Sequence, residues 1–109
     1  GNAEVYGNAR VYGDAHVHGN AQVHGNALVC GGSWSESPTQ IQGSKHFVNH
    51  CAPHKIKIGC QILSIQEWLD KKVIKSLASR HDYTKEQVKE YVGYIKIIAE
   101  KDKRLFGDL

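Results

Sequence analysis

Histidine and cysteine are concentrated in one short stretch of the chain. The stretch contains three histidines and two cysteines: His46, His50, Cys51, His54 and Cys60. Zinc in proteins takes four nitrogen or sulfur ligands in a tetrahedral array. Four residues of the stretch could supply such a set: His50, Cys51, His54 and Cys60. Because no cysteines are paired at knuckle spacing, we favour a buried cysteine pair beside surface histidines over zinc, and we expect no cofactor.

Polar residues just before this stretch offer a second kind of site, one for an anion. Residues 37–44 are mostly polar and include a glycine, and the backbone N–H groups of such a loop can cradle an anionic ligand. Lysines and histidines that follow would add positive charge. The residues expected to contact such a ligand are Ser44, Lys45, His46, His50, Lys55 and Lys57. A plain connection is the alternative for this loop, and its composition favours that alternative.

Three further histidines, His16, His18 and His24, point to acyl transfer, in which one histidine acts as general base on a hydroxyl or amine. They occupy outward positions of a strict repeat that has no inserted loop. Cys30 as a nucleophile would need an activating histidine, and His24, six residues earlier, faces a neighbouring side. We therefore name no catalytic residue and expect binding rather than catalysis.

The elements that position these residues begin with five tandem hexapeptides, GNAEVY, GNARVY, GDAHVH, GNAQVH and GNALVC. Repeats of this period mark β-helices. Alanine at the third position and valine at the fifth share one strand face, because side chains alternate along a strand, and they are expected to point inward. Glycine at the first position relieves crowding, and Asn or Asp at the second is expected to adopt positive φ at the bend.

This pattern resembles the left-handed parallel β-helix of hexapeptide-repeat proteins, in which three hexads form one triangular coil. The resemblance implies that hexad 1 stacks on hexad 4, with Tyr6 against His24, and that hexad 2 stacks on hexad 5. Five hexads are too few to stand alone, and proteins of this kind are commonly homotrimers. We therefore expect a homotrimer whose subunits meet on the most apolar face, formed by Tyr12, Leu28 and Cys30.

The segment after the repeat is less regular. Residues 33–38 have the composition of a loop. Residues 39–63 are expected to form irregular β structure, and Ile41 and Phe47 fall at hexad multiples from the last repeat valine, as if the repeat continued in degenerate form. Alternation of lysine and isoleucine in residues 55–58 predicts a half-buried strand.

Two helices are expected near the C-terminus. Ser64 with Glu67, and Thr84 with Gln87, form two capping-box patterns. Apolar residues recur at helical spacing after each, and the short connection predicts an antiparallel helical hairpin. The hairpin would cover the open edge of the repeat, which otherwise invites pairing with other chains. The expected fold is a left-handed β-solenoid (residues 1–32), a loop and degenerate β segment (33–63) and a helical cap (64–109).

Composition limits the partners and the location. The 109-residue chain has a net charge of +3, spread thinly rather than gathered in one basic stripe, so we do not expect it to bind a nucleic-acid polymer. No apolar run is long enough to cross a membrane. Three cysteines cannot all pair within the chain. With no secretion signal, we expect reduced thiols in the cytoplasm of a bacterial host, and a Cys51–Cys60 bridge is the alternative.

A wider resemblance covers nearly the whole chain. The repeat, the sequence SPTQIQGSKH, the sequence NHCAPHKIKIGC and a tryptophan-containing helical pair together resemble proteins encoded by bacteriophages and prophages. Small proteins of this sort are often accessory factors, including inhibitors of host defence. The resemblance implies a non-enzymatic protein that binds a host protein or sequesters a small anionic, nucleotide-like signal. The alternatives are an acyltransferase of the hexapeptide-repeat class and a structural module that trimerises and caps a longer phage protein.

Overall fold

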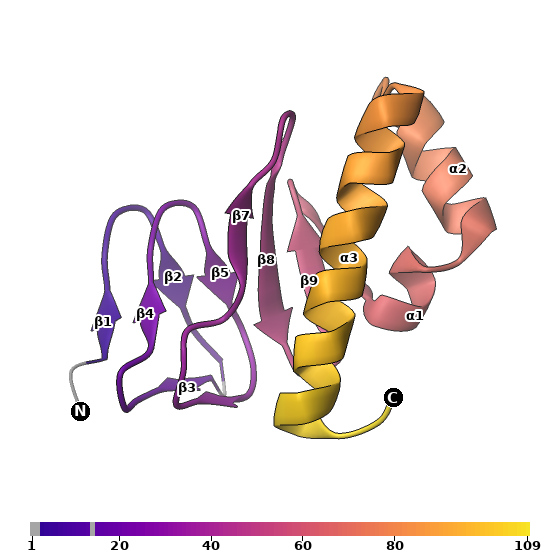
Figure 1. Cartoon of the computed structure of the whole chain (residues 1–109). Helices are drawn as coiled ribbons and strands as arrows, with labels where there is room; N and C mark the ends of the chain where they lie inside the picture. The colour runs from indigo at the N-terminus through magenta and orange to yellow at the C-terminus, as the bar shows by residue number, and fades with distance from the viewer. Residues whose placement is uncertain (1–2, 14) are drawn as a thin grey trace.

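Short strand pairs, an antiparallel sheet and helices follow one another from the N-terminus to the C-terminus (Figure 1). The structure is a computed structural model that describes residues 3–13 and 15–109, so Gly1, Asn2 and Asp14 lie outside it. The principal extents of the molecule are 42 × 30 × 21 Å. The body is therefore elongated, with the sheet between the repeat and the helices.

Each hexapeptide forms one two-residue strand, and each of the first three strands pairs in parallel with the third strand after it. The pairs are β1 (Glu4–Val5) with β4 (Gln22–Val23), β2 (Arg10–Val11) with β5 (Leu28–Val29), and β3 (His16–Val17) with β6 (Ser33–Trp34). The predicted stacking of hexad 1 on hexad 4 and of hexad 2 on hexad 5 is confirmed. The rings of Tyr6 and His24 stack with their centroids 5.6 Å apart.

The small and β-branched side chains of the repeat fill the interior between these pairs. The fully buried residues there are Ala21, Val23, Ala27, Val29 and Trp34. Trp34 comes from the segment predicted to be a loop, and that prediction is wrong where β6 pairs with β3. The indole N–H of Trp34 donates to the carbonyl oxygen of Gly31 at 2.8 Å, so the ring closes the interior with its polar atom satisfied.

The left-handed backbone at each bend falls on glycine and not on the Asn or Asp that follows it. The φ angles of these four glycines lie between +59° and +68°: Gly7, Gly13, Gly19 and Gly25. The prediction that Asn takes the bend is wrong for the described asparagines, and for Asn2 and Asp14 it falls outside the described residues. A Cβ on Gly19 would lie 2.9 Å from the carbonyl oxygen of Ser35. The bend therefore lacks both the space and the φ that a side chain needs.

A four-stranded antiparallel sheet follows, in the order β10-β9-β8-β7. Its strands are β7 (Gln40–Gln42), β8 (Phe47–Ala52), β9 (Lys55–Ile58) and β10 (Gln61–Ser64). The half-buried strand predicted for residues 55–58 is confirmed, with Ile56 and Ile58 buried. The prediction of irregular, degenerate repeat for residues 39–63 is wrong, because the short connections after β8 and β9 turn each strand back on its neighbour.

The sheet covers the C-terminal end of the repeat. The side-chain oxygen of Asn49 accepts from the N–H of Leu28 at 3.2 Å, and its side-chain NH₂ donates to the C=O of Leu28 at 2.7 Å. A buried amide side chain on β8 thus satisfies the backbone groups of β5, much as another strand would. The helical hairpin was expected to cover this edge. The sheet covers it at β5, and the last turn of α3 (Lys85–Phe106) adds Phe106, whose ring lies 5.0 Å from that of Trp34.

Three helices complete the chain: α1 (Ile65–Trp68), α2 (Lys71–Arg80) and α3 (Lys85–Phe106). Both predicted capping boxes are confirmed. The first predicted helix breaks in two, because Asp70 adopts extended backbone and its side chain accepts from the N–H of Lys72, which starts α2 afresh. None of the described helices combines the length and the apolarity needed to cross a membrane.

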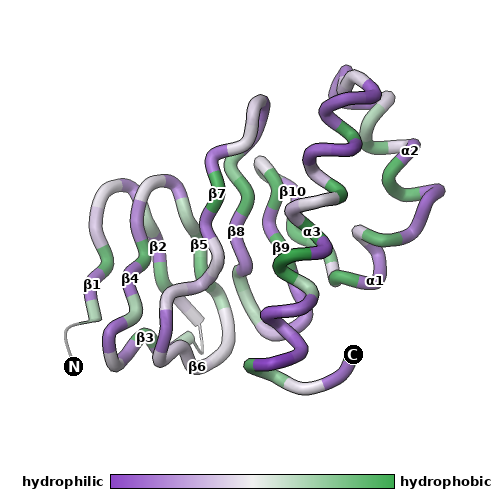
Figure 2. The backbone as a smooth tube through the Cα atoms, in the orientation of Figure 1, coloured by the Kyte–Doolittle hydropathy of each residue, from purple (hydrophilic) through white to green (hydrophobic). Residues whose placement is uncertain are grey.

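The fold class predicted for the whole chain is therefore wrong. In place of a solenoid with an irregular segment and a helical hairpin, the structure has short parallel strand pairs, a four-stranded antiparallel sheet and three helices. One hydrophobic core lies inside the strand pairs, and a second lies between the sheet and the helices. Hydrophobic and hydrophilic segments alternate along α3 (Figure 2), which buries Tyr91, Ile95 and Ile98.

Candidate binding pocket

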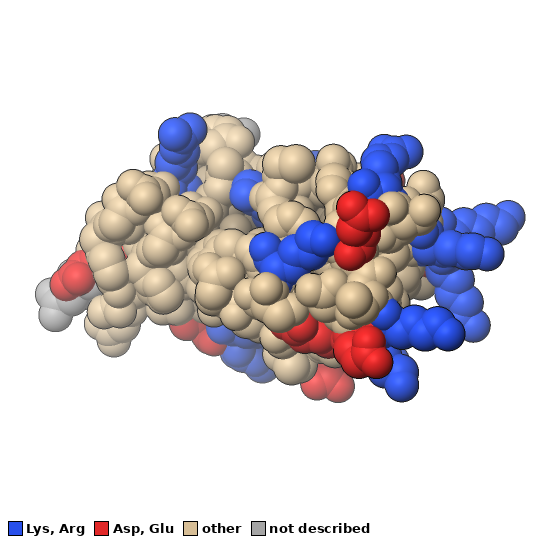
Figure 3. Space-filling view, turned by 90° about the horizontal axis from the view of Figure 1, so that it is seen from above, with Lys and Arg blue, Asp and Glu red and all other residues tan. Residues whose placement is uncertain are grey.

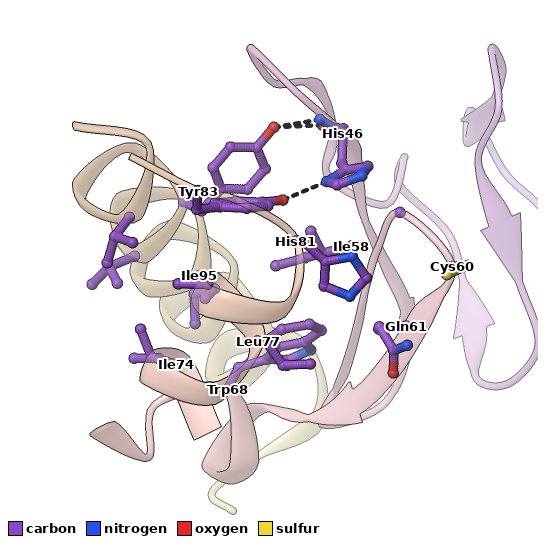
Figure 4. Close-up of a pocket in the computed structure, with 15 residues that line it drawn as sticks. His46, Ile58, Cys60, Gln61, Trp68, Ile74, Leu77, His81, Tyr83 and Ile95 are labelled. Carbon is purple, nitrogen blue, oxygen red and sulfur yellow. Dashed lines mark hydrogen bonds between the residues drawn. The ribbon is translucent and has the colours of Figure 1, made fainter. Parts of the chain in front are cut away.

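A cavity of about 70 Å³ lies between the β9–β10 end of the sheet and the helices α2 and α3. Its walls are mainly apolar and aromatic (Figure 4), and they include Ile58, Trp68, Ile74, Leu77, Tyr91 and Ile95. Pockets of this composition, with few polar groups among apolar ones, are typical binding sites. Of the residues predicted as metal ligands or as the oligomer interface, Cys60 alone lines it.

The cavity exists because α2 packs loosely. The helix is amphipathic, with Val73, Ile74, Leu77 and Ala78 on its inner side, yet none of its residues is buried. By contrast, α3 buries several side chains against the sheet. The short α1 and the turn at residues 81–84 tether both ends of α2, which holds the helix near the core without closing the gap.

Two tyrosines of the helical end anchor the loop between β7 and β8. The hydroxyl of Tyr91 accepts from the N–H groups of Lys45 at 2.8 Å and His46 at 2.5 Å, and it donates to the C=O of His46 at 3.0 Å. Gly43 permits this approach, because a Cβ there would lie 2.4 Å from the tyrosine oxygen. The hydroxyl of Tyr83 hydrogen-bonds Nδ1 of His46 at 2.5 Å.

The surroundings of His46 and Tyr83 favour the neutral form of each side chain. Burial, together with the nearby His81 and Lys45, lowers the pKa of His46 below its usual range. Burial, with Tyr91 beside it, raises the pKa of Tyr83. The pair formed by His46 and Tyr83 is therefore uncharged near neutral pH and adds little charge to the cavity.

His81 is the feature of the pocket that packing does not explain. It caps the C-terminus of α2, and its ring lies between Ile58 and Leu77 in the view of Figure 4. Nε2 of His81 is buried and has no hydrogen-bond partner among the described residues. A buried polar atom without a partner costs about 1–3 kcal/mol. An occupant of the cavity with a polar atom in reach would remove that cost.

The six residues predicted to hold an anion do not converge on one cavity. Ser44 bonds Glu90 through its N–H at 2.8 Å and its hydroxyl at 2.5 Å. Nζ of Lys45 donates to the backbone carbonyls of His81 and Asp82. Only His46 lines the main pocket. Of the others, His50 is buried below α3, Lys55 is exposed on β9, and Lys57 donates to the carbonyl of Gly59.

Lys57 also borders a second, shallow hollow of about 270 Å³ beside the repeat. Arg10, Asn8 and Asn26 also line it. Two cationic side chains and two amide side chains therefore meet at this hollow, which includes one of the residues predicted to bind an anion, Lys57. It is open and polar, so it offers an anion little exclusion from water.

The four candidate zinc ligands separate into three places, and Cys51 lies beside Cys30. His50 donates from Nε2 to Asp102 at 2.7 Å, and His54 bonds the same carboxylate through Nδ1 at 2.6 Å. Cys60 is exposed near the main pocket. Among the described residues, no group of three or more His, Cys, Asp or Glu side chains could hold a metal ion.

Asp102 is a buried charged residue that the sequence interpretation missed. It is 1% exposed and also accepts from the N–H of His54 at 2.6 Å. The available signal was its spacing, since it falls four residues after Ile98 and three after Ala99 on the apolar stripe of the last helix. An acidic residue on such a stripe indicates a buried polar partner.

The remaining predicted residues lie on the repeat. Tyr12 is 52% exposed, and Leu28 and Cys30 are half-buried against the sheet. His16 is exposed, and Nε2 of His18 bonds the hydroxyl of Ser33 at 2.8 Å. None of these residues lines the main pocket. The homotrimer and its interface at Tyr12, Leu28 and Cys30 remain predictions.

Comparison with known proteins identifies part of the chain. Residues 1–19 match the family model described as the YdcK beta solenoid repeat. The segment that contains the first hexapeptides therefore carries a β-solenoid repeat. No curated protein matches the chain, and no solved structure does.

Proposed function

We propose that this chain is a non-enzymatic binding protein that takes up an aliphatic side chain of an acidic partner segment in the cavity between α2, α3 and the sheet. The observation that carries the proposal is the buried, unpartnered Nε2 of His81 at the wall of an otherwise apolar cavity. A peptide backbone entering with the side chain supplies both a donor and an acceptor for such a nitrogen.

The size of the cavity favours an aliphatic group over a ring. Engineered apolar cavities of about 150 Å³ bind benzene, and this cavity has about half that volume. A group of valine or leucine size fits such a space. Burying it contributes roughly 1.5–3 kcal/mol, and the half-exposed apolar side of α2 would be covered at the same time.

The charge around the cavity favours an acidic segment. The helix α2 carries Lys71, Lys72, Lys75 and Arg80 and has no acidic residue within its bounds. Figure 3 shows lysine and arginine side chains projecting from the helical end of the molecule. Such a rim attracts acidic residues on either side of the docked side chain, and this attraction is weakened by salt.

The biological setting rests on the wider resemblance. An accessory or anti-defence factor of a phage acts on a host protein, and an acidic segment of such a protein is the partner that we infer. Sequestration of a small anionic signal is the second candidate, favoured by the hollow that Arg10 and Lys57 border. The acyltransferase and structural-cap alternatives gain no support from the pocket, which none of the repeat histidines lines.

Tryptophan fluorescence provides a direct test. Trp68 lines the cavity, and the other tryptophan, Trp34, is buried in the repeat. Titration with the peptide acetyl-EEDLDEE-amide should change the emission of Trp68 with a Kd on the order of 0.1–1 mM. The same peptide with alanine in place of leucine should bind at least about tenfold more weakly, since the apolar contribution is lost. A peptide with lysines in place of the acidic residues should not bind.

Matched variants locate the binding. Ala78→Phe fills the cavity and should abolish the response, whereas Ser79→Phe adds the same ring at an exposed neighbouring position and should not. Lys75→Glu should weaken binding several-fold at low salt, and Lys103→Glu, near the far end of α3, should not. Equal binding of the leucine and alanine peptides would exclude the pocket. Binding of free nucleotides that is lost with Lys57→Ala would favour the second candidate.

A further inference from the structure

Two of the three cysteines meet where the repeat joins the sheet. The N–H of Cys30, just after β5, donates to the C=O of Cys51 in β8 at 2.8 Å. The contact continues along both chains: a Cβ on Gly31 would lie 3.2 Å from Cβ of Ala52. Chain segments joined by a backbone hydrogen bond of this kind lie roughly 5 Å apart, which is inside the range of Cα separations that a disulfide spans.

The thiols of the two cysteines are near enough to interact. Cys51 is fully buried, and burial raises the pKa of its thiol to about 12, with a further contribution from the nearby Cys30 thiol. Cys51 lies at the point of β8 where the register with β9 shifts, between His50 and Ala52. The strand is therefore irregular at Cys51, next to its contact with the repeat.

The two thiols differ in access. Cys30 is half-buried, so a small reagent reaches it before it reaches Cys51. Cys60 is exposed near the main pocket and takes no part in this contact. Cys51 thus lies beside Cys30, and not beside Cys60, its partner in the bridge that was the alternative to reduced thiols.

We propose that Cys30 and Cys51 form a reversible disulfide site that a low-molecular-weight disulfide such as oxidised glutathione closes. The Cys30 thiolate attacks one glutathione sulfur, and a mixed disulfide forms as the first glutathione leaves as a thiolate. The Cys51 thiolate then attacks the Cys30 sulfur, and the second glutathione leaves. The two cysteine thiols are oxidised, one glutathione disulfide is reduced, and the two thiol protons pass to the departing glutathione thiolates.

Closing this bond fastens the repeat to the sheet covalently. The cross-link would join the end of β5 to β8 across the intervening β6 and β7. The cross-link closes the segment between Cys30 and Cys51 into a loop, which reduces the conformational freedom of the unfolded chain. Because the unfolded state is thereby destabilised, the melting temperature rises. For the loop from Cys30 to Cys51 in a chain of 109 residues, the rise is about 15 °C.

The test uses a Cys60→Ser variant, which removes the competing exposed thiol. After exposure to oxidised glutathione, intact mass should fall by about 2 Da, peptide mapping should join Cys30 to Cys51, and the melting temperature should rise. Dithiothreitol should reverse all three changes. With Cys51→Ser added, the reaction should stop at a glutathionylated Cys30. With Cys30→Ser added instead, the protein should remain unmodified under native conditions.

Two results would overturn the inference. One is accumulation of glutathionylated Cys30 in the Cys60→Ser variant while Cys51 stays free, which would mean that the sulfurs do not meet. The other is a disulfide whose formation lowers the melting temperature, which would mean that the folded structure must distort to form it. Neither result bears on the peptide pocket, because no residue of this pair lines it.

Discussion

Replacing Asp102 by alanine removes the carboxylate that fastens α3 to the sheet. That carboxylate is 1% exposed and accepts from Nε2 of His50 at 2.7 Å, and from N and Nδ1 of His54, each at 2.6 Å. The three bonds join the last turns of α3 to β8 and to the turn that follows β8. No apolar substitution can satisfy these donors.

The magnitude follows from what the substitution leaves behind. Nε2 of His50 would lose its partner in a fully buried position, and Nδ1 of His50 already has none among the described residues. Breaking a buried charged or hydrogen-bonded pair by removing one member costs roughly 3–5 kcal/mol. We expect Asp102→Ala to lower the free energy of unfolding by about 4 kcal/mol. Asp102→Asn, which keeps one acceptor oxygen and the size of the side chain, should cost about half as much.

Urea unfolding followed by far-ultraviolet circular dichroism measures these changes. The control is Asp108→Ala, which removes an acidic side chain that is 82% exposed and pairs with Lys103 at 3.6 Å. Exposed pairs contribute about 0–1 kcal/mol, so the control should unfold like the wild type. If Asp102→Ala and Asp108→Ala unfold within about 1 kcal/mol of each other, the carboxylate does not hold α3 to the sheet. Should the alanine variant fail to fold, Asp102→Asn carries the comparison.

Three further outcomes follow from other parts of the molecule. Burial lowers the pKa of His50 although Asp102 lies beside it. Below about pH 6.5 the unfolded chain therefore binds a proton that the folded chain does not, and the free energy of unfolding should fall as the pH drops. Urea unfolding midpoints measured across this pH range will show the fall, and a rise would contradict the reasoning. His81→Phe, which removes the unpartnered nitrogen, should raise the melting temperature by a few degrees and weaken binding of the leucine peptide. Gly43→Ala places a Cβ 2.4 Å from the hydroxyl oxygen of Tyr91 and should destabilise the fold. Gly93→Ala, with open space inside a helix, should stabilise it by up to about 1 kcal/mol; equal effects of the two substitutions in calorimetry would refute the steric argument.

The repeat shows which structural features a periodic sequence predicts and which it does not. Its six-residue period, together with the three hexads per coil implied by the resemblance to hexapeptide-repeat proteins, predicted which hexads stack, and the pairs β1–β4 and β2–β5 confirm the prediction. The same period also predicted that the repeat continues in degenerate form through residues 39–63, and this prediction is wrong. Ile41 and Phe47 fit the repeat spacing but lie on neighbouring antiparallel strands. An apolar residue at the right interval fits either arrangement. Turn geometry and the partner strand decided between them.

The helical end shows the same division. Capping boxes are local, so both helix starts at Ser64 and Thr84 were predicted correctly. The break at Asp70 is also local in origin, but a continuous apolar stripe concealed it. The pocket could not be predicted, because it arises from loose packing of α2 against elements that are distant in the sequence.

The stretch of histidines and cysteines from His46 to Cys60 illustrates what the sequence and the tertiary structure each determined. The sequence by itself determined the residue types, the alternation of β9 and the repeat register, because these depend on neighbours one to six residues away. Only the tertiary structure decided that His50 and His54 share Asp102, that Cys51 meets Cys30, and that His46 and His81 lie at one cavity. Cys30 and Cys51 are 21 positions apart in the sequence, and His50 and Asp102 are 52 positions apart. Residues so distant in the sequence are brought together by the folding of the chain.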